Sequence, residues 1–119
     1  MDTRTNVRRR YVEQLASVKE IVVPFAHNKE FVSNYIMPVV ITKGDVAYRD
    51  SVRDKIHAAG VQTSVHYPAV HRFSVYSDYP VVLPQTEYVT DHEITLPMYA
   101  ALTMDQVDYI CSVLDSALR

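Results

Sequence analysis

The stretch Gly60-Val61-Gln62-Thr63-Ser64-Val65-His66-Tyr67-Pro68-Ala69-Val70-His71 decides how the rest of this 119-residue sequence is interpreted. Gly60 is suited to close a preceding helix, because glycine adopts the left-handed backbone conformation at little cost. Residues 61–66 then form a short β-type run that stops at Tyr67-Pro68. Two histidines and a tyrosine gather where this run gives way to a loop, so the polar groups most suited to binding or chemistry are concentrated there.

The segments before this stretch predict a strand and a helix that lead into it. Residues 32–42 are the longest β-like run and are apolar on both faces, while Pro38 in the middle argues for an edge strand or a bulge. Residues 43–45 predict a turn, and residues 46–59 a helix. The helix has an apolar stripe formed by Tyr48, Val52, Ile56 and Ala59. Its outer face carries mixed charges, from Arg49, Asp50, Arg53, Asp54 and Lys55.

Helical periodicity also marks both ends of the chain. Residues 5–18 carry apolar side chains at one-face spacing, and the stripe consists of Val7, Tyr11, Leu15 and Val18. This helix is expected to extend from the sheet, since its stripe must be buried against something. The last helix begins after Thr103, which forms a capping-box pattern with Gln106. Its apolar stripe contains Val107, Ile110, Cys111, Leu114, Ala117 and Leu118.

The remaining segments complete a small sheet. Residues 21–23 are a short extended run, residues 27–30 a polar connector, and residues 73–79 an irregular aromatic segment. A helix is predicted from Leu83-Pro84 to about residue 92, followed by a short strand at 94–97. The sum is an α/β (α+β) two-layer sandwich, with a small mixed or antiparallel sheet of three to four strands and helices mainly on one face. We expect one domain over residues 1–119, with a leading helix at 1–18 and an α/β body at 19–119.

Composition excludes several classes of function. The formal net charge is −2, so no polybasic surface favours nucleic acid or an anionic membrane. No apolar run is long enough to span a bilayer, and no apolar segment follows the N-terminus as in a signal peptide. The single cysteine, Cys111, cannot form an internal disulfide, which favours a cytoplasmic location. With only Gly44 and Gly60, the chain has neither a phosphate loop nor a dinucleotide fingerprint.

The histidines are the first candidates for chemistry. A metal bound by His66 and His71 would need further ligands, and the available Asp78, His92 and Glu93 stand at no recognised spacing, so we expect no metal site. At a strand end, His66 is placed either as a general acid or base or as a half-buried residue hydrogen-bonded to a backbone group.

Other reactive side chains have structural explanations. Cys111 lies on an apolar helix stripe and is expected to be an inert core thiol. The lysines, Lys19, Lys29, Lys43 and Lys55, fall in loops or on charged faces and so lack the apolar surroundings that activate a lysine. The residues by themselves contain no complete catalytic constellation.

The order of motifs nevertheless resembles a known family. In sequence, these motifs are Arg8-Arg9-Arg10-Tyr11, Tyr48-Arg49-Asp50-Ser51-Val52, the Gly60–His71 stretch, Leu83-Pro84-x2-Glu87, Glu93-Ile94-Thr95-Leu96-Pro97-Met98-Tyr99 and Leu102-Thr103-x2-Gln106-Val107. In this order they resemble the C-terminal small domain of the DegT/DnrJ/StrS family of sugar aminotransferases, over nearly the whole chain. Tyr67-Pro68-Ala69 departs by one residue from the more usual spacing in that family.

The resemblance implies a function that this chain completes only in part. Enzymes of the family use pyridoxal phosphate to move an amino group onto a keto group of a nucleotide-linked sugar. Their large domain carries the cofactor lysine and has no counterpart here, so no cofactor is expected on this chain alone. The small domain closes one side of the cleft, which implies substrate binding by His66, Tyr67 and His71 and no catalytic residue in this chain.

Three roles therefore stay open. The chain is a stand-alone copy or fragment of the small domain, inactive alone; or half of a split aminotransferase; or a binding module that kept the fold without the chemistry. Its expected partner is a chain with the large domain, or a second copy of itself, bound through helix 5–18. A helix deprived of the large domain is expected to dimerise or to fold back on its own chain.

Overall fold

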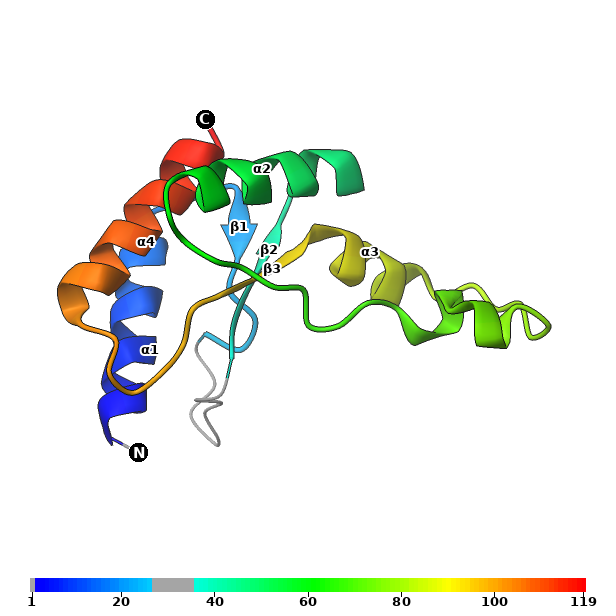
Figure 1. Ribbon diagram of the computed structural model, residues 1–119, viewed down its shortest axis with the longest axis horizontal. Coiled ribbons are helices and arrows are strands. Elements are labelled where there is room, and N and C mark those ends of the chain that lie inside the picture. Colours follow the sequence, from blue (N-terminus) through cyan, green and yellow to red (C-terminus); the bar gives the residue numbers. More distant parts are fainter. Residues whose placement is uncertain (1, 27–35) are drawn as a thin grey trace.

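The computed structural model describes residues 2–26 and 36–119, and it places four α-helices around a small antiparallel sheet (Figure 1). The polar connector at 27–30 and the first part of the strand expected at 32–42 lie outside these residues. The elements are α1 (Asp2–Leu15), β1 (Ile21–Val22), β2 (Met37–Ile41), α2 (Val46–Ala58), α3 (Pro84–His92), β3 (Glu93–Leu96) and α4 (Met104–Ala117). Two short 3₁₀ turns, Val70–Arg72 and Ser74–Tyr76, precede α3.

The sheet has the order β1-β2-β3, and both pairings are antiparallel. Its register places Met37 opposite Leu96 and Val39 opposite Ile94, so these four side chains share one face. All four are buried in a core with the stripes of α1, α2 and α4. This confirms the expected sandwich with helices mainly on one face, and β2–β3 alternation leaves Pro38, Val40, Glu93 and Thr95 on the other face.

The leading helix folds back onto its own chain. It ends at Leu15 rather than residue 18, because the chain turns there and Val18 donates its backbone N–H to the Leu15 carbonyl at 3.0 Å. The stripe formed by Val7, Tyr11, Leu15 and Val18 is buried, and α1 lies alongside α4 (Figure 1). The expectation that this helix extends away from the sheet is therefore wrong. Of the two outcomes expected for a helix without the large domain, it folds back on its own chain, since α4 supplies the apolar surface that it needs.

The proline of β2 costs no ladder hydrogen bond. β2 is the central strand, so the expectation of an edge strand is wrong for its C-terminal half, where β1 pairs with Val40 and Ile41. Both backbone groups of Thr95 bond to Ser64, so Thr95 presents none to Pro38. The missing N–H of Pro38 accordingly faces the β1 side, beyond the end of that two-residue strand.

The strand expected at 61–66 is reduced to a single bridge. Ser64 and Thr95 exchange two backbone hydrogen bonds of 3.1 and 2.7 Å on the side of β3 away from β2. Within the described residues this pairing is an isolated bridge and does not extend into a ladder. Both this bridge and β2 are antiparallel to β3, so the segment runs in the same direction as β2. Gly60 closes α2 with a φ of 88°, as predicted.

Four local predictions are confirmed. The turn at 43–45 places the Asp45 carboxylate where it caps α2, and a complete capping box joins Thr103 to Gln106 at the start of α4. Pro84 occupies the first turn of α3, and the apolar stripe of α4 is buried. Residues 70–83, here called the arm, project away from the three packed helices, and α3 leads back from them to the sheet (Figure 1).

Candidate functional site

The stretch that enters the site is clamped to α2 at Thr63. The Arg53 guanidinium donates to the Thr63 hydroxyl at 3.0 Å and to its carbonyl at 3.2 Å. The backbone N–H of Thr63 donates in turn to Nε2 of His57 at 3.2 Å. The outer face of α2 therefore differs from the expected row of solvated charges, because Arg53 and His57 hold the chain that leads to His66.

The ring of His66 is held on the sheet face that lies opposite the core. Its Nδ1 is 2.9 Å from the Thr95 hydroxyl, and that hydroxyl lies 2.6 Å from Oε2 of Glu93. The backbone N–H of His66 donates to the other oxygen of the same carboxylate at 2.9 Å. His66 is half-buried, as one of its two alternatives required, but the group that its ring contacts is a side chain rather than backbone.

The carboxylate of Glu93 is almost enclosed, with 2% of the residue exposed. Burial raises the pKa of Glu93, while the hydrogen bonds from Thr95 and from the His66 backbone oppose that rise. Behind it lies Arg49, whose guanidinium donates to the carbonyls of Thr90 and Glu93 at 2.8 and 3.0 Å. Arg49 was expected on the solvated face of α2 and is instead buried, because it bonds to the junction between α3 and β3.

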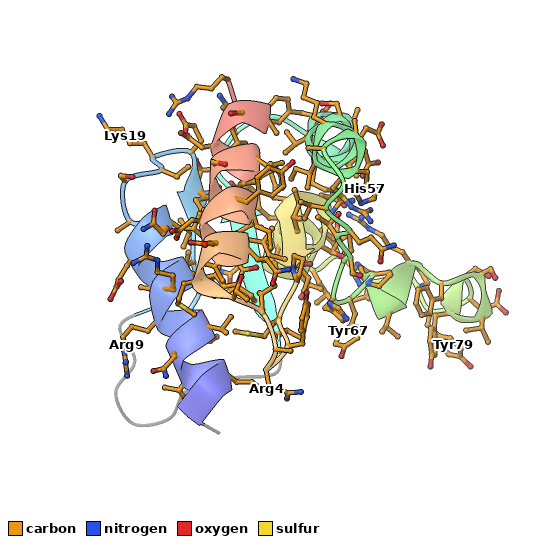
Figure 2. All side chains as sticks on the ribbon, turned by 60° about the vertical axis from the view of Figure 1, so that its left-hand side comes forward. Arg4, Arg9, Lys19, His57, Tyr67 and Tyr79 are labelled. Carbon is orange, nitrogen blue, oxygen red and sulfur yellow. The ribbon has the colours of Figure 1, made fainter. Side chains whose placement is uncertain are left out.

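Tyr67 lies at the surface beside His66. The residue is 72% exposed, and its ring meets the ring of His66 edge-on with 4.8 Å between centroids. Figure 2 shows Tyr67 where the arm leaves the body and Tyr79 near the outer end of the arm. The Thr90 hydroxyl donates to the Tyr67 carbonyl at 2.8 Å, so α3 holds the backbone while the phenol faces solvent.

His71 belongs to a different cluster, at the base of the arm. Its Nε2 lies 3.0 Å from Oε2 of Glu87 on α3, and that oxygen also accepts the backbone N–H of Leu83 at 2.9 Å. Arg72 binds Asp91 at 2.7 Å and the second oxygen of Glu87 at 3.4 Å. These contacts, led by the Leu83 N–H, lower the pKa of Glu87, which fastens both ends of the arm.

The structure thus keeps the predicted site residues in two groups. His66 and Tyr67 share one cluster, whereas the ring of His71 contacts Glu87 on α3. Among the residues that the structure describes, no three His, Cys, Asp or Glu side chains are grouped to hold a metal ion. Within the same residues, no helix is both long and apolar enough to cross a bilayer.

Two of the site's residues could have been found from sequence. Glu93 and Thr95 are two apart in the strand, so they share the face opposite Ile94 and Leu96. Two polar side chains on one face of a buried strand are a signal for a polar partner across that face. Arg49 gave no such signal, since its position among charged neighbours is typical of a solvated helix face.

The other reactive groups do not form a second site. Cys111 is buried on α4, as predicted, and burial raises the pKa of its thiol to about 12. The three lysines of the described residues, Lys19, Lys43 and Lys55, are exposed. The Lys43 amine lies 3.4 Å from the Leu118 carbonyl and above the ring of Tyr48. None has the desolvated setting that would make it a nucleophile at neutral pH.

A family model describes almost the entire chain. The model of the DegT/DnrJ/EryC1/StrS aminotransferase family matches residues 1–115. The chain belongs to this aminotransferase family. The motifs that resembled the family in sequence, from Arg8 to Val107, all lie within the matched range.

Several solved structures share the fold. Helicobacter pylori PseC, an aminotransferase involved in the biosynthesis of pseudoaminic acid, superimposes with a TM-score of 0.90 at 19% identity over 98% of this chain. The PMP form of the putative sugar aminotransferase Spr1654 from Streptococcus pneumoniae gives 0.88 at 22% identity over 98%. DesV from S. venezuelae, in complex with a ketimine intermediate, gives 0.84 at 22% identity over 99%. The matched region is 32%, 30% and 32% of those chains, so this family member spans about a third of their length.

Proposed function

We propose that this chain is the small-domain part of a pyridoxal-phosphate-dependent nucleotide-sugar aminotransferase. In this role it forms one wall of the cleft in which an amino group is transferred to a keto sugar. The observation that carries the proposal is the family match over residues 1–115, together with alignment to about a third of each related structure. On this proposal residues 1–119 form one domain, and the cofactor-binding domain lies outside them.

The described residues do not fit the cofactor's aldehyde. A pyridoxal-phosphate enzyme needs a lysine that forms a Schiff base, and such a lysine must be desolvated or placed beside another cation to be unprotonated at neutral pH. Lys19, Lys43 and Lys55 are all exposed. No step of the reaction is therefore assigned to this chain, which by itself is inactive and binds no cofactor in our proposal.

His66 and Tyr67 are proposed to contact the nucleotide-sugar. Tyr67 offers a largely exposed ring, which is suited to pack on a sugar or a base, and a hydroxyl to hydrogen-bond with it. His66 lies beside it with its ring held in place by Thr95. His71 is proposed to act on the arm rather than on the ligand, because its ring is occupied by Glu87.

The arm is proposed as the surface that docks on the cofactor-binding domain. Only one charged residue, Asp78, occurs between residues 73 and 83. The exposed apolar side chains of the arm are Val70, Phe73, Val75, Tyr76, Tyr79, Val81, Val82 and Leu83. An apolar surface of this kind, fastened at its base by Glu87 and carried away from the body, is typical of an interface. The apolar stripe of residues 5–18 is buried within the chain, so we do not assign self-association to it.

A cytoplasmic location is part of the proposal. The one cysteine is a buried free thiol, as is usual where the environment is reducing.

The site assignment is tested by adding UDP-N-acetylglucosamine to the ¹⁵N-labelled chain and following its amide resonances. We expect concentration-dependent shifts around His66 and Tyr67, which weaken in Tyr67→Ala. Tyr109→Ala is the matched control, because Tyr109 is also an exposed tyrosine but lies on α4. Shifts centred on another surface, or no shifts up to millimolar ligand, would contradict the ligand contacts and favour a non-catalytic interaction module.

A further inference from the structure

We propose that Thr95 and Glu93 are positioning residues that keep His66 protonated on Nδ1, so that its bare Nε2 accepts a hydrogen bond from a ligand hydroxyl. This deepens the proposed function and rests on it for the identity of the ligand. The state of the ring itself follows from contacts within the chain and is measured without any ligand.

The carboxylate of Glu93 is anchored at both of its oxygens. Oε1 accepts the backbone N–H of His66 at 2.9 Å, and Oε2 lies 2.6 Å from the hydroxyl of Thr95. A distance of 2.6 Å is typical of a hydroxyl that donates to a charged carboxylate. The backbone of His66 therefore holds the Glu93 carboxylate, which in turn orients the His66 ring through Thr95.

The number of available protons sets the direction of the hydrogen bonds that link Glu93, Thr95 and His66. An ionised carboxylate has no proton to donate, and a threonine hydroxyl has one. When that single proton points to Oε2 of Glu93, the oxygen of Thr95 presents only lone pairs to His66 Nδ1, 2.9 Å away. Nδ1 must then carry the proton of that contact, and in a neutral imidazole Nε2 has none.

The protonated form of Glu93 would reverse this order. A carboxylic acid would donate to Thr95, whose own proton would turn to His66 Nδ1 and leave the ring proton on Nε2. Burial favours that form by raising the pKa of Glu93, while the bonds from Thr95 and the His66 backbone and the nearby Arg49 charge favour ionisation. The ionised order is the one adopted here, since Oε1 accepts the His66 N–H and the 2.6 Å separation between Thr95 and Oε2 is typical of donation to a charged carboxylate.

The orientation has a consequence for recognition. No protein group in the described residues is hydrogen-bonded to Nε2 of His66, and the ring lies beside the exposed Tyr67. A bare ring nitrogen attracts a hydroxyl or an N–H and repels phosphate oxygens, which offer only lone pairs. The group of a nucleotide-sugar that meets His66 is therefore a sugar hydroxyl rather than the diphosphate.

The test is the tautomer of His66, measured by long-range ¹H–¹⁵N correlation of the ring in the full chain at neutral pH. We expect the Nδ1–H pattern in the unmodified protein. Thr95→Val keeps the shape of the side chain but removes the hydroxyl, so the ring should shift to the Nε2–H form that neutral histidine favours in water. Thr42→Val is the matched control, since the Thr42 hydroxyl bonds to the Glu20 carbonyl and should leave His66 unchanged.

A second variant keeps the proposal testable if Thr95→Val fails to fold. In Glu93→Gln the side-chain oxygen can still accept the His66 N–H, while the amide NH₂ donates to Thr95 and turns the threonine proton to Nδ1. This variant should also give the Nε2–H form. An unmodified ring that is protonated on Nε2, singly or doubly, or an Nδ1–H signal that survives both variants, would overturn the proposal. Either result would leave the assignment of the chain as a small domain intact.

Discussion

The guanidinium of Arg49 on α2 donates a 3.0 Å hydrogen bond to the backbone carbonyl of Glu93 at the start of β3. The same nitrogen donates to Thr90 at 2.8 Å. One side chain thereby joins α2 to β3, the strand that carries Glu93 and Thr95. Because the guanidinium is buried, water cannot easily replace it as a donor to these two carbonyls.

Arg49→Met tests this link directly. Methionine keeps most of the apolar stem but leaves both carbonyls unbonded, and a buried unsatisfied group costs about 1–3 kcal/mol. We expect the free energy of unfolding in urea to fall by about 2–4 kcal/mol. Arg9→Met is the control, since Arg9 is exposed on α1 and should change it by less than about 0.5 kcal/mol. Equal effects of the two substitutions would show that the buried hydrogen bonds of Arg49 do not stabilise the fold.

Glu93 should make stability depend on pH in a defined direction. Its folded-state pKa is raised by burial, so the folded state holds the proton more tightly than the unfolded state. Its contribution is therefore fully present below the unfolded pKa and is lost as pH rises through the folded pKa. Glu93→Gln stays neutral, so its stability relative to the unmodified chain should rise from about pH 4.5 upward, the ordinary pKa of the group. Parallel denaturation midpoints across that range would contradict the assignment.

Two of the tyrosines that donate to backbone carbonyls form a natural comparison. The buried Tyr11 hydroxyl donates to Pro97 at 2.6 Å, whereas the exposed Tyr109 hydroxyl donates to Ala59 at 2.7 Å. Tyr11→Phe should lower the free energy of unfolding by about 1–2 kcal/mol, because the partly buried hydrogen bond to the Pro97 carbonyl is lost. Tyr109→Phe should cost less than about 0.5 kcal/mol, since water replaces the hydroxyl. Thermal or urea unfolding of the two variants measures the difference, which would vanish if burial played no part.

The arm should matter for association and not for folding. Val82 on the arm is 76% exposed, so Val82→Ser should leave the stability of the chain within about 0.5 kcal/mol. The same substitution should weaken copurification with the domain that carries the cofactor lysine. Val46→Ser is the matched control, because Val46 is also exposed but begins α2. A docking loss of equal size in the control, or none in Val82→Ser, would remove the arm from the interface.

Local signals in the sequence predicted most of the elements correctly. Thr103 with Gln106, Pro84 and Gly60 each act through their nearest neighbours, and the structure confirms all three. The errors came from long-range partners. Pro38 is tolerated in a central strand because β1 is too short to reach it. Helix α1 folds back because α4 offers it an apolar face.

The candidate site was less predictable for the same reason. His66 and Tyr67 could be selected from a strand end, but the groups that orient the ring, Glu93 and Thr95, are 27 and 29 residues away. The charge of Arg49 predicted a solvated residue, and only its contact with β3 explains its burial.

We propose above that this chain is a cleft wall without the cofactor lysine. Its most direct test is titration of the folded chain with pyridoxal phosphate while the absorbance of the aldimine is recorded. We predict only the weak, non-saturating signal that exposed lysines give. Substituting Lys19, Lys43 or Lys55 singly should reduce this signal only by the small contribution of one surface amine. A saturable aldimine band that one lysine-to-alanine substitution abolishes would show instead that this chain itself holds the cofactor lysine.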